Sequence, residues 1–182
     1  SRWPSAWASY KFSDMMFAVR SQPGSTTEDA PVTKVPAHRI LVATFNECLK
    51  KKCVVNSGSD GGGAPPIDLT EDDIVAASLL KLLLFIYARK PVRPGDLKPM
   101  GTKELCSLLN GAKALGMQQA AESCRDELHE RINSDVHSSL IGILVYADEK
   151  VDDRLYKACL EKITKLASAT FNSLFNSISA TN

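Results

Sequence analysis

The sequence has 182 residues, 24% of them charged and 44% hydrophobic, and its formal net charge at pH 7 is +1. This length is sufficient for one large domain, or for a domain with a helical extension, around a substantial core. Positive and negative side chains are interspersed, which argues against nucleic acid and anionic membranes as partners. The chain shows neither a secretory signal region nor a membrane-spanning stretch, and its first residue is Ser, which suggests a piece of a longer protein.

The first residues of the chain are rich in aromatic side chains. Trp3, Trp7 and Tyr10 recur at helical spacing, and Phe12 follows them. Such a concentration of aromatic side chains needs a surface to pack against. Residues 1–11 are therefore expected to form an arm that docks either on the chain's own core or on a second subunit.

Three short segments have the pattern of strands. The apolar residues 15–20 follow Ser13 and Asp14, and residues 32–35 alternate apolar and polar side chains, so the two predict a hairpin with a long connection. Residues 67–69 predict a single edge strand. Before it, residues 56–66 are rich in Gly, Ser and Pro and predict a flexible insertion that cannot pack a core. Its glycines lack the following Lys-Ser/Thr of a phosphate-binding loop.

Two helices are predicted in the first half of the chain. One begins near Pro36 and continues to Leu49, where a run of three lysines ends it. The other covers residues 73–89, with Thr70 as its N-cap, and is apolar on nearly all sides, which indicates burial from several directions. The apolar run is too short to span a membrane. Leu83 and Phe85 of this helix are expected to be buried.

The second half of the chain is predicted to be helical after a connection over residues 91–101, which is rich in Pro and Gly. Apolar side chains recur every three or four residues over 105–115, 117–132, 136–147 and 155–166, and a last short helix is predicted over 171–178. Gly116 separates the first two of these helices. The lengths and breaks predict antiparallel helix pairs that stack one hairpin on another.

No pattern of catalytic or metal-binding residues is evident. The five cysteines (Cys48, Cys53, Cys106, Cys124 and Cys159) are odd in number and irregularly spaced, which favours reduced thiols in the cytoplasm or nucleus. His38 is expected to be buried and hydrogen-bonded, because His129 and His137 lie on other helices without a nucleophile or carboxylate at matching spacing. We therefore expect a protein that is not an enzyme and needs no cofactor or metal.

Five short motifs nevertheless occur in a characteristic order. They are residues 13–19, 36–41, 67–69 and 85–87, and then 114–117 with Cys124 and Leu128. Together they resemble the ordered signatures of a BTB/POZ domain, over residues 12–132. Residues 133–182 resemble the helical extension, the start of a BACK-type region, that often follows such domains in speckle-type and kelch-like adaptors.

The resemblance implies an α+β fold, in which a small three-stranded sheet is capped by a cluster of helices and followed by helical hairpins. It also implies a protein-interaction module that forms a homodimer through its N-terminal elements and first helix. Asp14 and Arg39 match a charged pair that lies near the dimer groove in the family, and they can equally hold the first strand to the first helix. The expected interface contains Trp3, Trp7, Tyr10, Phe12 and Arg39.

Many members of the family recruit substrates to a cullin-3 ubiquitin ligase, and these often carry a hydrophobic-x-Glu motif after the helix that follows Ala-His. The equivalent segment here is Leu49-Lys50-Lys51, so that an ammonium replaces the carboxylate and reverses the local charge. The candidate partner surface is a shallow groove formed by Leu49 and the loop after Tyr87, with Lys50 and an exposed Lys51 at its rim. Two functions remain open: a cullin-3 adaptor, and a cullin-independent scaffold in a transcriptional or signalling assembly.

Overall fold

The computed structural model describes residues 13–21, 31–55, 65–70, 72, 74–134 and 137–179. The aromatic residues Trp3, Trp7, Tyr10 and Phe12, and residues 56–64 of the predicted flexible insertion, lie outside the described residues. Within the described part, the fold is α+β, as expected: two helices lie between the second and third strands of a three-stranded sheet, and the chain after the third strand is mainly helical.

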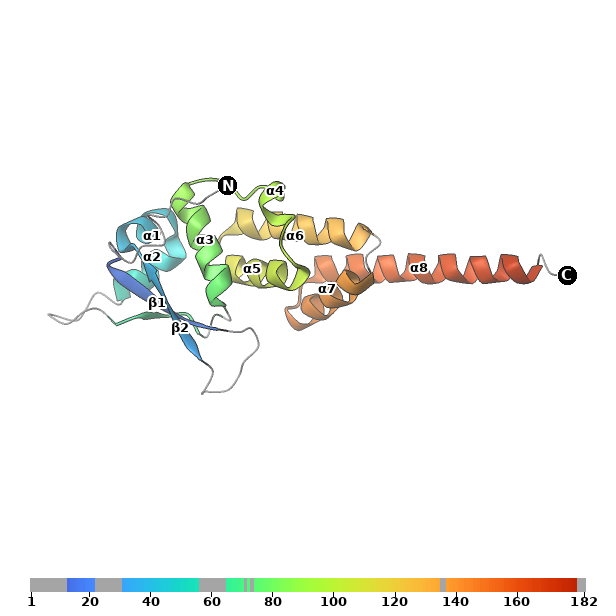
Figure 1. The fold of residues 1–182 in the computed structure, drawn as a ribbon, viewed down its shortest axis with the longest axis horizontal. Coiled ribbons are helices and arrows are strands. Elements are labelled where there is room, and N and C mark those ends of the chain that lie inside the picture. Colours follow the sequence, from blue (N-terminus) through green and yellow to red (C-terminus); the bar gives the residue numbers. More distant parts are fainter. Residues whose placement is uncertain are drawn as a thin grey trace.

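The sheet has the order β2-β1-β3 (Figure 1). β1 (Met15–Arg20) pairs antiparallel with β2 (Val32–Ala37), and β3 (Ile67–Asp68) pairs parallel with β1 on its other side. Alternate side chains of β1 are buried, because successive side chains in a strand point to opposite faces. The predicted hairpin and the predicted edge strand are therefore confirmed.

The predicted helix after Pro36 is two helices, α1 (Arg39–Phe45) and α2 (Glu47–Val55). The break falls at Asn46, whose backbone is extended. The Asn46 side-chain oxygen accepts a hydrogen bond from the backbone N–H of Leu49, at 2.8 Å, which caps α2. Its side-chain amide donates to the backbone oxygen of Leu115, at 2.9 Å, and so ties the break to the helical half of the chain.

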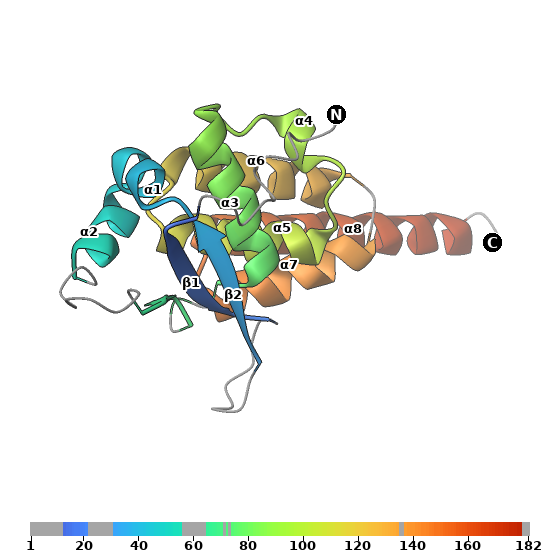
Figure 2. The same cartoon turned by 60° about the vertical axis from the view of Figure 1, so that its left-hand side comes forward.

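The apolar helix is α3 (Ala76–Ala88), and it occupies the centre of the molecule (Figure 2). It contacts β2, α1 and α5, so it is buried from several directions as predicted. Leu83 is buried as expected, whereas Phe85 is only partly buried. The predicted N-cap, Thr70, is wrong. The N-cap is Val75, because the backbone of Val75 is held beside Arg20 of β1 in a β-bridge and the helix begins only after it.

The short α4 (Pro94–Leu97) interrupts the connection after α3. It is followed by α5 (Thr102–Ala114) and α6 (Gln118–Asn133), which pack against each other. Gly116 lies between them with φ +65°, a left-handed backbone that favours glycine. A second pair follows, α7 (His137–Glu149) and α8 (Asp153–Ser179), so the predicted antiparallel pairs are confirmed.

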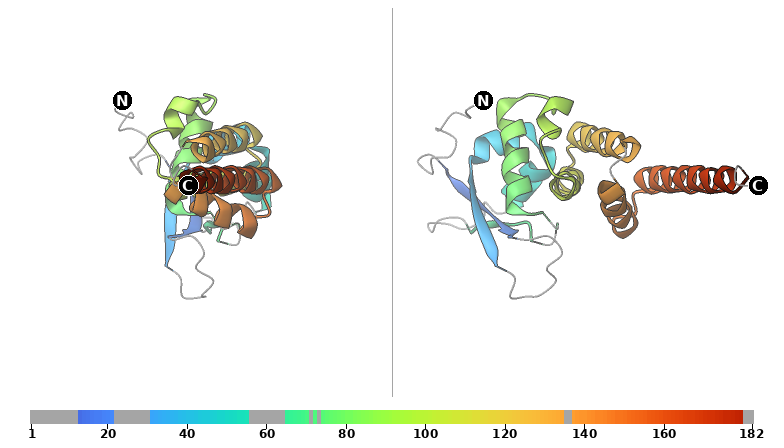
Figure 3. Two further views of the ribbon diagram at one scale, coloured as in Figure 1. Left: turned by 90° about the vertical axis from the view of Figure 1, so that its right-hand side faces the viewer. Right: turned by 45° about the vertical axis from the view of Figure 1, so that its right-hand side comes forward.

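The end of the chain differs from the prediction of two helices. α8 continues without a break through residues 166–171, because no Gly or Pro interrupts them. Its first half packs against α6 and α7, and its second half extends away from the other helices (Figures 1 and 3).

Candidate interaction surfaces

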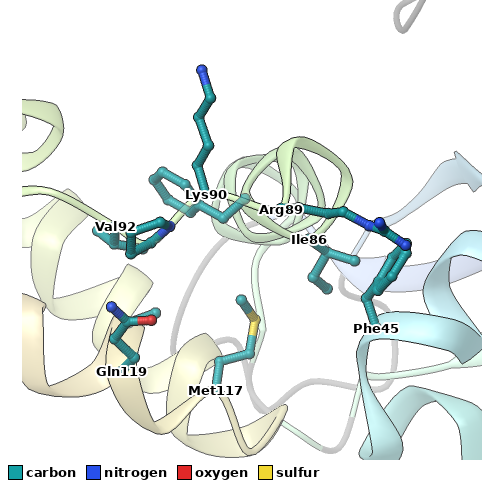
Figure 4. Close-up of a pocket in the computed structure, with 10 residues that line it drawn as sticks. Phe45, Ile86, Arg89, Lys90, Val92, Met117 and Gln119 are labelled. Atoms are coloured by element: carbon teal, nitrogen blue, oxygen red, sulfur yellow. The ribbon is translucent and has the colours of Figure 1, made fainter.

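A groove of about 420 Å³ opens at the C-terminal end of α3 (Figure 4). We call it the α3-end groove. Its walls come from the end of α1, the end of α3, the loop that follows α3 and the beginning of α6. The lining residues are Phe45, Phe85, Ile86, Arg89, Lys90, Pro91, Val92, Met117, Gln119 and Ala120.

The backbone at Arg89 shapes one wall of this groove. Arg89 caps α3 in the left-handed conformation, with φ 50° and ψ 31°, and its N–H donates to the backbone oxygen of Ile86. This conformation is uncommon for a residue with a Cβ atom. The guanidinium of Arg89 lies over the Phe45 ring, 4.0 Å from its centroid, in a cation–π contact that joins the ends of α3 and α1.

The loop after α3 is also fixed against α6. The hydroxyl of Ser123 donates to the backbone oxygen of Val92, at 3.3 Å, and the Val92 side chain is buried. Phe45, Phe85 and Met117 are only partly buried, so they carry apolar surface that the groove leaves open. The arrangement can therefore accept large apolar side chains from a partner.

The predicted partner surface needs one correction. Leu49 is 0% exposed, so the prediction that it lines a surface groove is wrong. Asn46 caps the start of α2, and in this helix Leu49 and Cys53, which are one turn apart, both point into the core. Lys51 is exposed as predicted, and Lys50 is exposed in an ion pair with Glu47 at 3.1 Å. Phe45, one residue before the break, lines the groove in place of Leu49.

Tyr87 lies on α3 beside the beginning of α1 and not among the lining residues of the groove. Its hydroxyl oxygen accepts a hydrogen bond from the backbone N–H of His38, at 3.0 Å, and lies 3.4 Å from His38 Nδ1. Burial raises the pKa of Tyr87. The rings of His38 and Tyr87 meet edge-on, with their centroids 5.7 Å apart. His38 is hydrogen-bonded as expected, but it is half-buried and not buried as predicted.

Asp14 and Arg39 lie together at the other expected surface. A carboxylate oxygen of Asp14 accepts a hydrogen bond from the backbone N–H of Arg39, at 2.7 Å, where α1 begins. The Arg39 guanidinium donates to the backbone oxygen of Cys53, at 3.1 Å. The contact holds the start of β1 to the start of α1. Next to Arg39, the Ile40 side chain is 73% exposed, which leaves an apolar side chain on the solvent side of α1.

Among the described residues, no group of three or more His, Cys, Asp and Glu side chains is placed to hold a metal ion. Cys53, Cys106, Cys124 and Cys159 are buried free thiols, and burial raises the pKa of Cys106 and of Cys124 to about 12. His129 bonds Asn133 on α6, and the side chain of His137 lies outside the described part. No helix in the described ranges is both long and apolar enough to cross a membrane.

Comparison of the chain with protein-family models and with curated proteins finds no match in either.

Proposed function

We propose that this chain is a BTB/POZ-type interaction module, a non-enzymatic and dimeric adaptor that presents the α3-end groove to a partner protein. The observation that carries the proposal is the groove itself, in which partly buried Phe45, Phe85 and Met117 are left open beside two cationic side chains. Open apolar surface with a polar rim is typical of a protein-binding site. The order β1-β2-α1-α2-β3-α3, which follows the motif order of the sequence, supports the same class.

Dimerisation is supported by the surface of α1. Ile40 is 73% exposed beside Arg39, at the helix expected to form the interface. We predict that Ile40→Asp shifts the protein from dimer to monomer, because a carboxylate there would be buried at a two-fold interface opposite its own copy. Light scattering at micromolar concentration measures the mass. Val54→Asp is the matched control, since Val54 is 67% exposed on α2. A wild-type particle of about one chain mass contradicts the proposal.

The specific role that we propose is recruitment of substrates to a cullin-3 ubiquitin ligase in the cytoplasm or nucleus. Calorimetric titration against the N-terminal domain of cullin-3 tests it, with wild type and Lys51→Glu side by side. If the lysine only disturbs a cullin surface, Lys51→Glu tightens binding and leaves the melting temperature unchanged. Wild-type affinity that drops on Lys51→Glu would mean that the lysine itself is recognised.

A second candidate function is a cullin-independent scaffold in a transcriptional or signalling assembly. The exposure of Lys51, at the position where cullin-binding BTB domains often carry a carboxylate, favours this alternative. In that case neither the wild type nor Lys51→Glu binds cullin-3 measurably, and the dimer persists.

A further inference from the structure

We infer that the α3-end groove binds an acidic segment of a partner protein, in which large apolar side chains are flanked by Asp or Glu. This inference rests on the proposed function and specifies the chemistry of the partner at the same groove.

The first argument is the charge of the groove. Among the described residues that line it, the charged side chains are Arg89 and Lys90. Figure 4 shows Arg89 directed towards Phe45 at one wall and Lys90 extended away from Met117 and Gln119. Two cations at the rim of an apolar groove favour carboxylates beside the apolar anchors of a partner, and disfavour basic segments.

The second argument is that the acidic side chains near the groove in sequence already have partners. Glu47, two residues after Phe45, pairs with Lys50 at 3.1 Å. Glu122, on α6 two residues after the last lining residue, pairs with Arg125 at 2.7 Å and with Arg154 at 3.0 Å. These carboxylates are engaged with other cations, so the positive field of Arg89 and Lys90 is available to a partner.

The third argument is the geometry of Arg89. A guanidinium that stacks on an aromatic ring directs its N–H groups sideways in its own plane, where they can bind a carboxylate in two places. The cation–π contact with Phe45 restricts the Arg89 side chain before a partner binds. A pre-positioned Arg loses less conformational entropy on binding than a free one.

The partner is a separate protein and not the aromatic arm of this chain. The arm offers suitable aromatic side chains, but its two charged residues are Arg2 and Lys11. Both would meet Arg89 and Lys90 as like charges. The volume of about 420 Å³ lies within the range of roughly 300–1,000 Å³ that ligand sites occupy, which allows two or more large side chains to enter.

The test is selection of binders from a displayed library of random 12-residue peptides on the whole chain. We expect the enriched peptides to contain aromatic or large aliphatic residues flanked by Asp or Glu, and to carry a net negative charge. A fluorescent copy of the most enriched peptide is then titrated against wild type and variants. Replacing its acids by Gln or Asn lowers affinity at least fivefold, and raising the salt from 50 to 300 mM weakens wild-type binding.

Two variants locate the site. Arg89→Asn keeps a residue that tolerates the left-handed backbone, and Lys90→Glu reverses an exposed charge. Each variant is expected to lower the affinity for the peptide at least fivefold. Lys98 is an exposed cation outside the lining, so Lys98→Glu should change the affinity less than twofold. The methyl resonance of Met117 shifts on binding. Circular dichroism melts show that the variants remain folded.

Four results overturn the inference: no enrichment of any peptide, enrichment of neutral or basic peptides, equal losses for Lys90→Glu and Lys98→Glu, or an unshifted Met117 methyl. Light scattering on the same samples separates the two proposals. A dimer that selects no acidic peptide refutes the inference and leaves the dimeric module standing. A monomer refutes the dimeric adaptor.

Discussion

The carboxylate of Asp152 lies 2.6 Å from the ammonium nitrogen of Lys113, across the junction between the α5–α6 pair and the α7–α8 pair. Arg125 of α6 adds a second contact to the same oxygen, at 3.0 Å. Asp152 is 5% exposed and also accepts a hydrogen bond from the backbone N–H of Leu155, in the first turn of α8. One buried carboxylate therefore ties both helix pairs together and caps the last helix.

We predict that Asp152→Asn lowers the free energy of unfolding by about 2–4 kcal/mol, because it leaves two cations near the core without their carboxylate. The expected loss is smaller than that for a fully buried ion pair, since the Lys113 side chain is partly exposed to solvent. Urea denaturation measures the loss. Asp153→Asn, an exposed neighbour in the first turn of α8, should cost less than about 1 kcal/mol. Equal losses at the two positions would show that the ion pairs do not stabilise the junction.

The same group predicts a dependence of stability on pH. Burial acts to raise the pKa of Asp152, but hydrogen bonds from Lys113 and Arg125, together with their charges, outweigh burial and lower it. Because the pKa is lower in the folded state, the stabilisation is fully present above the unfolded value, near pH 4, and is lost as the pH falls through the folded value. Urea midpoints of wild type and Asp152→Asn should differ most at pH 6–7 and converge below about pH 4. A difference that stays constant down to pH 3 contradicts this account.

The packing of α3 is tested by two leucines on the same helix. Leu83→Ala is expected to cost roughly 2–5 kcal/mol, because truncation in a close-packed core leaves a cavity. Leu83 is 2% exposed, whereas Leu80 is 48% exposed. Leu80→Ala should therefore cost much less, and the comparison removes the effect of helix propensity. Chemical denaturation measures the free energy of unfolding of both variants. A larger loss for Leu80→Ala than for Leu83→Ala would mean that the buried face of α3 is wrongly assigned.

The break at Asn46 is expected to contribute to stability through its side chain. Asn46→Ala removes the cap on Leu49 and the bond to the Leu115 oxygen, and both groups are buried, so the expected cost is about 1–3 kcal/mol. Thermal denaturation followed by circular dichroism measures it. Asn172→Ala is the control, because Asn172 is exposed on α8. A variant at position 46 as stable as the wild type would show that the break does not depend on this side chain.

The sequence predicts the elements of this fold better than it predicts where they begin and end. The apolar run of α3 and the alternation in β1 are local patterns, and both are found where they were expected. The start of α3 was misplaced because Val75 is held by a contact with Arg20, which is distant in sequence. Asn46 does carry a local signal, since Asn favours a cap over a helix interior, and that signal would have divided the predicted helix.

The groove was predicted in part. The sequence placed a partner surface at the loop after Tyr87, and the structure has a groove there, but with Phe45 where Leu49 was expected. Asn46 also donates a hydrogen bond to the backbone oxygen of Leu115, 69 residues away, and no local pattern reveals this contact between the break and the helical half of the chain. The contribution of Met117 likewise depends on how the turn at Gly116 brings α6 to the end of α3.

Because α8 is uninterrupted, a small rotation of this helix is amplified at its far end. A helix of 27 residues is about 40 Å long at 1.5 Å per residue, and its far half has no neighbouring helix among the described elements. A rotation of about 10° at the end of its packed half would therefore swing the far end by roughly 3.5 Å. The turn between α7 and α8 contains Val151 in a left-handed backbone and the buried Asp152. The contacts of Asp152 with Lys113 and Arg125 hold the start of α8 to α5 and α6, so the base from which the far half extends is fixed to the first helix pair.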